Sequence, residues 1–336
     1  MVRTAIVIAG QPSALLPMAN RPLAGHAVHA LARAGVERVA VAAEPSVRGE
    51  LEEALDGSRL GVPDVTFVEQ DGAGGLPALL AELDSFVADE PFVLHLGDSL
   101  NRSNLGPLLG QPGRRGSTVI FERPCADERV VELARLRDMV DAPADQGPAA
   151  GVWVFGSGAL DAIAGGTPSG SAELDAQLAT QRLRELGGQV TTRSVTEWWR
   201  FRQRQDELLD GNRFVLEGLD GEPVRAQLSD TRIEGPVAIH PSARLASSVV
   251  RGPVVIGANA SLRDAYVGPY SSIGEGVTIE GAEVENSIIL AEASIRHVGG
   301  RLEASVVGAR ARVFRDFRLP RAIRLNVGEG AEVSLT

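Results

Sequence analysis

Ile256–Ile279 reads IGANASLRDAYVGPYSSIGEGVTI, and aliphatic residues in this stretch recur six positions apart. The same interval extends from about Ile233 to Val313. The residues in this spacing are Ile233, Ile239 and Leu245; Ile256 and Leu262; Val267, Ile273 and Ile279; Ile289 and Ile295; and Val307 and Val313. Several of them are followed directly by glycine, as in Ile273-Gly274. Neither an α-helix nor an ordinary strand produces a period of six.

A period of six is typical of hexapeptide repeats, in which each short strand forms one side of a triangular coil. The aliphatic side chain points into the coil, and the small residue after it allows the chain to turn the corner. We therefore predict a left-handed parallel β-helix from about residue 233 to 315. The segment Arg318–Thr336 is expected to pack back on the coils and to cap their open end.

Residues 1 to about 215 alternate short apolar runs with amphipathic stretches. The runs expected as strands are 5–9, 39–43, 65–69 and 92–96, and the stretches expected as helices are 26–34, 48–55 and 76–86. This alternation indicates βαβ units, a mainly parallel sheet and helices on both faces. The predicted fold is a Rossmann-like α/β domain at residues 1–220, followed by the β-helix domain at residues 221–336. Ligands of such sheets bind at the carboxyl ends of strands, here after Ala9, Glu69 and Leu96.

The composition excludes several classes of protein. The chain has 336 residues, a formal net charge of -11 and one cysteine, Cys125. No apolar run is long enough to span a bilayer, the N-terminus lacks a signal-peptide pattern, and a lone cysteine forms no internal disulfide. We expect a cytoplasmic protein with no membrane partner, and the acidic balance argues against a nucleic-acid partner. All 33 basic residues are arginine, so no lysine can bind a phosphate or act as a nucleophile.

Sequence motifs lie along nearly the whole chain. They are IVIAG at 6–10, LLPMANRPLAGHAVHALARAGV at 15–36, FVEQDGAGGLPALL at 67–80, FVLHLGDS at 92–99, GVWVF at 151–155, AELD at 172–175, GNRFVLEGL at 211–219 and PRAIRLNVGEGAEV at 320–333. Together with the hexapeptide region, they resemble the long form of glucose-1-phosphate thymidylyltransferase, within the sugar-1-phosphate nucleotidyltransferase family. The resemblance implies a nucleotide or sugar-phosphate ligand and assembly into a homo-oligomer.

The resemblance also assigns a nucleotide site. Ala9 and Gly10 fall where the family binds the nucleotide, at the end of the first strand. Gln70 and Gly75 keep the separation with which the family contacts the edge of the nucleobase. Simple turn geometry would explain Gly75 as well as a binding role does.

A sugar site and a metal site are implied in the same way. Gly151 and Glu173 match positions that contact the sugar, and Asp98 matches the first of two aspartates that hold Mg2+. A turn would equally explain Gly151, and a strand-end cap or a salt bridge would equally explain Asp98.

The chain departs from the family pattern where the phosphates are bound. The family has a glycine-rich loop after the first strand, whose amides and arginine hold the phosphates. Here IVIAG is followed directly by QPSALLP, a connection shorter by about a dozen residues that lacks the arginine. The position that matches the family's lysine is Ser13. The candidates to supply a replacement cation are Arg21, Arg200 and Arg202.

The segments that match the family's metal and sugar-phosphate motifs also depart from the family pattern. The position of the second metal aspartate is Phe201, so we expect Mg2+ binding to be weak. The family's sugar-phosphate segment falls near Leu133–Arg137, where Arg135 and Arg137 would meet either a phosphate or solvent. His297, within the hexapeptide region, is weak support for acyl transfer.

Three functions follow from these observations. The first is a degenerate, non-catalytic nucleotidyltransferase homologue that binds a nucleotide or sugar phosphate and regulates a pathway enzyme as a heteromeric partner. The second is an active nucleotidyltransferase with a rebuilt site. The third is a different transferase activity on the same scaffold. The short connection, Ser13 and Phe201 favour the first, whereas Asp98, Gln70 and Glu173 favour the second.

Overall fold

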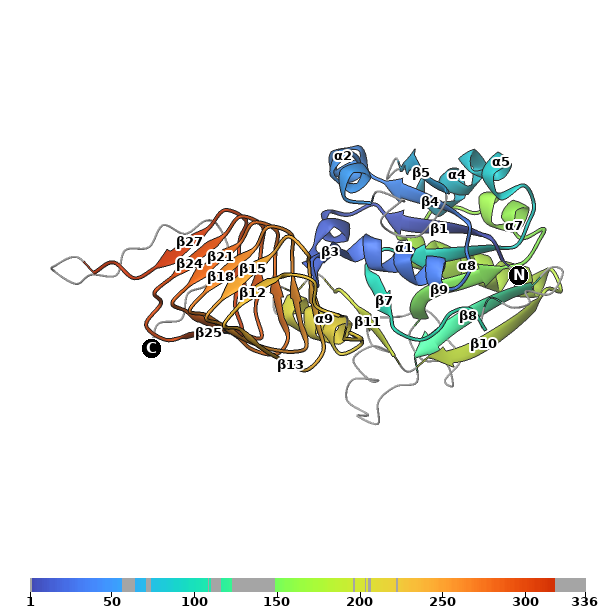
Figure 1. Ribbon diagram of the computed structural model, residues 1–336. Helices are drawn as coiled ribbons and strands as arrows, with labels where there is room; N and C mark the ends of the chain where they lie inside the picture. The colour runs from blue at the N-terminus through green and yellow to red at the C-terminus, as the bar shows by residue number, and fades with distance from the viewer. Residues whose placement is uncertain are drawn as a thin grey trace, which may run out of the picture.

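The computed structural model describes residues 2–55, 64–70, 74–107, 109, 116–122, 149–195, 197–202, 204, 207–221 and 223–317. An α/β domain and a stack of β-coils lie side by side, with helix α9 (Glu207–Leu216) at their junction (Figure 1). Among the described residues, no helix is both long and apolar enough to cross a membrane. Four expectations fall outside the described residues, namely those for Cys125, Arg135, Arg137 and the segment 318–336.

The α/β domain is built on a seven-stranded sheet of order β10-β8-β9-β6-β1-β4-β5. Its strands are β1 (Thr4–Ala9), β4 (Arg38–Ala43), β5 (Asp64–Glu69), β6 (Phe92–Leu96), β8 (Gly116–Glu122), β9 (Ala149–Phe155) and β10 (Gln189–Val195). Strand β1 is parallel to both of its neighbours, β4 and β6, whereas β9 is antiparallel to β6 and β8. The mainly parallel sheet predicted from the sequence is confirmed.

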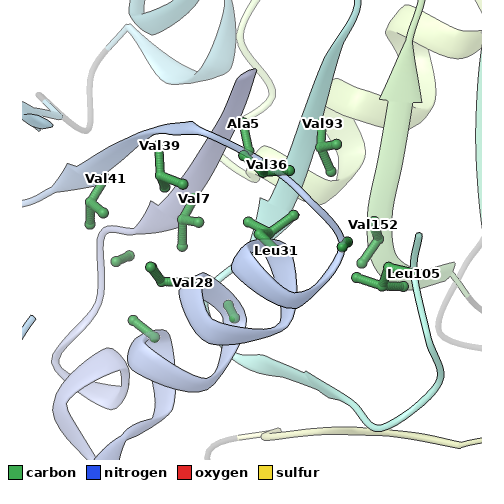
Figure 2. Close-up of a cluster of buried hydrophobic side chains, with 14 of the residues drawn as sticks. Ala5, Val7, Val28, Leu31, Val36, Val39, Val41, Val93, Leu105 and Val152 are labelled. Atoms are coloured by element: carbon green, nitrogen blue, oxygen red, sulfur yellow. The ribbon is translucent and has the colours of Figure 1, made fainter. Parts of the chain in front are cut away.

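Helices cover both faces of this sheet because alternate residues of each strand are apolar on both sides. One face carries α1 (Leu23–Arg33) and α2 (Pro45–Ala54), and Figure 2 shows Val28 and Leu31 of α1 packed near Val7 of β1. The other face carries α4 (Gly75–Glu82), α5 (Asp84–Val87), α7 (Leu160–Ala164) and α8 (Ala172–Glu185). The single helix expected over 76–86 is two helices, because the backbone at Leu83 leaves helical geometry (φ −88°, ψ 9°).

The C-terminal half is a left-handed parallel β-helix. Its strands form three parallel sheets of six, five and five strands. They are β12 (Gln227–Ser229), β13 (Arg232–Glu234), β14 (Val237–Ile239), β15 (Arg244–Ala246), β16 (Val249–Arg251), β17 (Val254–Ile256), β18 (Ser261–Arg263), β19 (Tyr266–Val267), β20 (Ser271–Ile273), β21 (Thr278–Glu280), β22 (Glu283–Glu285), β23 (Ile288–Ile289), β24 (Ser294–Arg296), β25 (Arg301–Glu303), β26 (Val306–Val307) and β27 (Arg312–Phe314).

Each side of the β-helix stacks one aliphatic residue per coil into a buried ladder. On one side Ile256 pairs with Ile273, and Ile273 with Ile289, all at most 1% exposed. The coils do not advance by six residues on every side, since the step from Leu262 to Val267 is five. This shorter side explains why the period of six is interrupted along the sequence.

Polar contacts join the two halves at α9. The buried Asn212 accepts hydrogen bonds from Ala19 N at 2.8 Å and from Ser272 Oγ at 2.6 Å, and it donates to Tyr270 O at 3.0 Å. Asn20 donates from Nδ2 to Ile273 O at 2.7 Å. Ala19 and Asn20 form the turn of a short hairpin, β2 (Pro17–Met18) and β3 (Arg21–Pro22), so this hairpin is fixed to the β-helix.

Candidate functional site

The candidate site lies at the carboxyl ends of β1, β5 and β6, where the sequence places it. Ala9 ends β1 and is 2% exposed. Gly97, which follows β6, donates its N–H to Ile8 O at 2.7 Å. A methyl group at Gly97 would lie 2.7 Å from that oxygen, so this position requires glycine. The close approach brings Asp98 beside the end of β1.

Asp98 is held beside Arg200 by strand pairing. Strand β7 (Ser99–Asn101) pairs antiparallel with β11 (Trp198–Arg200), with Arg200 opposite Ser99. The Phe201 N–H continues this pairing by donating to Asp98 O at 2.9 Å. Arg200 Nε then donates to Asp98 Oδ2 at 3.1 Å. The sequence leaves three roles open for Asp98, namely metal ligand, strand-end cap and salt-bridge partner, and the structure contains the salt bridge.

Glu173 contacts the other side of the same guanidinium group. It lies in the first turn of α8, which Ser171 caps by accepting from Leu174 N. Arg200 Nη1 donates to Glu173 Oε2 at 2.5 Å. The three side chains are 21–27% exposed. Burial by itself would lower the pKa of Arg200, but the Asp98 and Glu173 carboxylates more than offset it, and the pKa is raised.

Gly151 supports the Asp98 carboxylate through Ser99. Gly151 has a positive φ of 76°, and a methyl group there would overlap Ser99 Oγ. The absence of that side chain lets the buried Ser99 donate from Oγ to Asp98 Oδ1 at 3.3 Å. A close-packing role is therefore sufficient to explain Gly151, and its sugar contact stays a prediction.

His95 lies below the site in β6 and is fully buried. Its Nδ1 lies 2.7 Å from Leu96 O, and its Nε2 lies 3.4 Å from Asn101 Nδ2. Burial lowers the pKa of His95 to about 4, with the bond to Leu96 O opposing the shift. The ring is therefore neutral at pH 7 and adds no positive charge to the site.

Gln70 lies against Gly10 on the side of the site where the resemblance places a nucleobase. Gln70 follows β5, and its N–H donates to Ala43 O at 2.9 Å. A methyl group at Gly10 would lie 2.9 Å from Gln70 Oε1. This Oε1 is buried and has no hydrogen-bond partner among the described residues. An unpaired buried acceptor is costly, so it is suited to a ligand N–H donor.

Gly75 allows the Asp175 side chain of α8 to approach the start of α4 closely. It has a positive φ of 58°, and a methyl group there would lie 2.8 Å from Asp175 Oδ2. The buried Asp175 accepts from Leu76 N at 3.0 Å and from Ser169 N at 2.7 Å, which ties α4 to α8. The turn geometry considered for Gly75 thus accounts for it, and its nucleotide contact stays a prediction.

The segment where the resemblance places the phosphates is a short connection without a positively charged side chain. Residues 10–16 join β1 to β2, and Pro12–Leu15 form a 3-10 helix, η1. Two of its amides are used internally, since Ala14 N donates to Gln11 O and Leu16 N donates to Ser13 O. Residues 10–16 contain no arginine. Proline also removes one N–H that could otherwise bind a phosphate.

Phe201, at the expected place of the second metal aspartate, belongs to an apolar cluster. It is 8% exposed and packs with Met18, Leu23 and Leu100. Its ring centroid is 6.2 Å from that of Trp199. Among the described residues, no group of three or more His, Cys, Asp and Glu side chains is placed to hold a metal ion.

The structure therefore brings the sequence-predicted residues to one edge of the sheet and adds two that the sequence did not assign. The sequence offers Arg200 only as one of three candidate cations, and it assigns no role to Asp175. The signal for Arg200 was its place directly before Phe201, in the segment that matches a metal-binding motif. The signal for Asp175 was a carboxylate two residues after Glu173, in the first turn of a helix.

Comparisons with known proteins give two curated relatives and one solved structure of note. The low-salt glycan biosynthesis nucleotidyltransferase Agl11 of Haloferax volcanii is 34% identical over 96% of this chain and 94% of its own. The glucose-1-phosphate thymidylyltransferase of Streptomyces antibioticus is 28% identical over 96% of this chain and 93% of its own.

The solved structure is a Bacillus anthracis chain assigned as a glucose-1-phosphate thymidylyltransferase, in complex with sucrose. It matches with a TM-score of 0.51 and 20% identity, over 62% of this chain and 93% of its own. At that identity, it supports the fold alone. A comparison with models of protein families gives no match.

Proposed function

This chain belongs to the sugar-1-phosphate nucleotidyltransferase family, and from that premise we propose that it binds a nucleotide or sugar phosphate without joining the two. In this proposal the protein is a ligand-responsive partner in a sugar or secondary-metabolite pathway. Its partner would be a second copy of the chain or an active enzyme.

The observation that carries the proposal is the short connection between β1 and β2. Nucleotidyl transfer brings a triphosphate against a sugar phosphate, so two polyanions must be held together in a partly dry site. Backbone amides and cations offset that repulsion in catalytic sites. Residues 10–16 hold no arginine, and two of the amides in this connection already bond within it.

Arg21, the first cation along the chain after β1, does not replace the missing arginine. Arg21 lies in β3, past the turn that is fixed to the β-helix. Burial lowers its pKa, as expected for a cation in a poorly solvated place. The Arg200 guanidinium contacts Asp98 directly, but its Nε and Nη1 are already used by two carboxylates.

The case for ligand binding rests on the other side of the site. Gln70 Oε1 is a buried acceptor without a partner among the described residues, and it faces the backbone at Gly10. Glu173 and Asp98 lie at the same edge of the sheet. A protein that keeps these groups but lacks a phosphate-binding loop is suited to binding a nucleotide or sugar phosphate rather than to nucleotidyl transfer.

An active enzyme with a rebuilt site is the second candidate. The observation in its favour is that Asp98, Glu173 and Gln70 all keep positions matching the family at one edge of the sheet. In that case an arginine from elsewhere would have to neutralise the phosphates, for example Arg200 after release from its carboxylates.

Pyrophosphate release tests the first candidate against the second. Each of dTTP, UTP, CTP, ATP and GTP is incubated with glucose-1-phosphate and Mg2+, with a catalytic family member assayed in parallel. We expect at least a hundred- to a thousandfold lower rate, the usual loss for a single missing electrostatic donor. Turnover of about one per second that Asp98→Asn abolishes would establish the active enzyme instead.

Thermal melting tests ligand binding separately. A ligand that binds the native state raises the melting temperature, so one of these nucleotides or sugar phosphates should do so. Gln70→Leu should remove the shift caused by a nucleotide while leaving that caused by a sugar phosphate. If neither class of compound moves the melting temperature, the binding part of the proposal is wrong.

A further inference from the structure

The family to which the chain belongs implies a divalent metal ion at Asp98, and the residues present do not fit one. A hard cation such as Mg2+ needs several oxygen ligands in a near-octahedral arrangement. The position of the second carboxylate is occupied by Phe201, whose ring packs with Met18 and Leu23. Among the described residues, no cluster of three potential ligands surrounds Asp98.

A permanent cation lies at that place instead. The Arg200 guanidinium lies between the Asp98 and Glu173 carboxylates, at 3.1 Å and 2.5 Å. A divalent ion approaching Asp98 Oδ2 would meet a fixed positive charge at contact distance, and the two would repel each other. An arginine guanidinium is charged throughout the neutral range, so this competition does not depend on pH there.

The backbone places Arg200 in this position before any ligand binds. The β7–β11 pairing sets Arg200 opposite Ser99, and the Phe201 N–H bonds to Asp98 O. Ser99 Oγ then donates to the second carboxylate oxygen, Asp98 Oδ1. Both oxygens of Asp98 therefore have donors from the protein itself, and neither needs a metal ion.

We propose that Arg200 is a built-in cation that takes the place of the divalent metal at Asp98, so that this pocket holds its ligand without a metal ion. The charge of the trio is one negative unit, with two carboxylates against one guanidinium. The inference goes beyond the proposed function because it does not depend on whether the protein is catalytic. A binding protein and an active enzyme would both hold their ligand without a metal ion at Asp98.

Direct Mn2+ binding tests the inference on the full chain. After treatment with EDTA, free Mn2+ is followed by its electron paramagnetic resonance signal in the wild type, Arg200→Met and Arg202→Met. Arg202 is the matched control, because it is an exposed arginine two residues along. We expect Arg200→Met to gain one site with a Kd of about 10⁻³ M or tighter, the range of weak oxygen-ligand sites. The wild type and Arg202→Met should lack it.

A second substitution shows where the gained ion binds. Adding Asp98→Asn to Arg200→Met should abolish the gained site, because the carboxylate freed by removing Arg200 is lost. The inference is overturned if the wild type binds Mn2+ stoichiometrically and Asp98→Asn removes that binding. It is also overturned if Arg200→Met folds, as judged by circular dichroism, and gains no site.

Melting of the single variant Asp98→Asn decides the question if Arg200→Met does not fold. With Arg200 as the partner of Asp98, this substitution should lower the melting temperature by roughly 2–4 °C, equally in EDTA and in excess Mg2+. With Mg2+ as the partner, the loss would appear only when Mg2+ is present, and that result would overturn the inference. Pyrophosphate release plays no part in either readout, so the proposed function can fail independently.

Discussion

Arginine–carboxylate pairs occur both on the β-helix and at the edge of the α/β sheet, and they differ in what they connect. On the β-helix, Arg251 pairs with Glu234 at 3.0 Å, and Arg301 pairs with Glu285 at 2.7 Å. These pairs join neighbouring coils that the strand ladders already hold in register. The Arg251 side chain is 54% exposed, so its charge remains largely solvated.

At the sheet edge, Arg200 connects segments that lie far apart in the sequence. Its partners are 102 residues away at Asp98 and 27 residues away at Glu173. The Arg200 side chain is 21% exposed, less than half the value for Arg251. Breaking an ion pair costs more where the pair is partly desolvated, as at Arg200, whose bond to Glu173 also joins β11 to α8. An exposed pair whose two sides a backbone ladder already joins is nearly neutral.

The largest loss of stability is expected from a substitution in the buried aliphatic ladder of the β-helix. Ile279 is fully buried and stacks between Leu262 and Ile295. Ile279→Ala should lower the free energy of unfolding by about 2–5 kcal/mol, because it removes buried methyl groups and leaves a cavity. Urea denaturation measures this loss, and Ile279→Val, at about 0.5–1.5 kcal/mol, is the graded control. A loss below that of the valine variant would show that the ladder does not carry the stability of the coils.

The next largest loss of stability should come from a substitution at the contact between the α/β domain and the β-helix. Asn212→Ala leaves Ser272 Oγ without its partner in a buried place and Ala19 N and Tyr270 O without theirs in partly buried places. Unpaired buried groups cost about 1–3 kcal/mol each when nothing replaces the bond, so we expect calorimetry to resolve separate melting of the α/β domain and the β-helix.

The matched control for this substitution is Asn104→Ala. Asn104 is an exposed asparagine whose Oδ1 accepts from Gly106 N within its own loop. It should leave a single transition at the wild-type temperature. One cooperative transition in both variants would mean that the two halves are joined mainly by other contacts.

The smallest losses of stability are expected from removing the arginines of the two kinds of ion pair, and comparing them tests the distinction directly. Arg251→Met should leave the melting temperature unchanged, because it removes an exposed pair from coils joined by the strand ladder. Arg200→Met should lower the free energy of unfolding by about 1–2 kcal/mol, less than a fully buried pair would cost, because the site is partly solvated. Equal shifts in the two variants would remove the distinction between the two regions.

Much of the fold could be predicted from the sequence because its patterns are local. The run Ala5–Ala9 predicts β1 within one residue, and the spacing from Ile256 to Leu262 predicts the coils. The pattern failed at Leu83, where one predicted helix is two, since both pieces are apolar on the same side. It also left the five-residue side of the coil unassigned, because a step of five between Leu262 and Val267 interrupts the repeat.

The site was predictable as a set of positions but not as a set of contacts. Ala9 ends a strand, Gly10, Gln70 and Asp98 follow strand ends, and parallel strands bring their carboxyl ends to one edge. Arg200 could not be assigned, because its partners lie in the loop after β6 and in helix α8. Only the antiparallel pairing of β11 with β7 places it beside Asp98.

The sequence by itself determined two regions with different periods, a connection after the first strand that contains no arginine, and an aromatic residue, Phe201, directly after Arg200. These properties are local, because they depend on which residues follow one another. The tertiary structure decided that Asp98 and Glu173 share one guanidinium group, and that Asn212 joins the hairpin after this connection to the β-helix. Such contacts join residues distant in sequence, and they arise only when the strands and helices that carry them pack together.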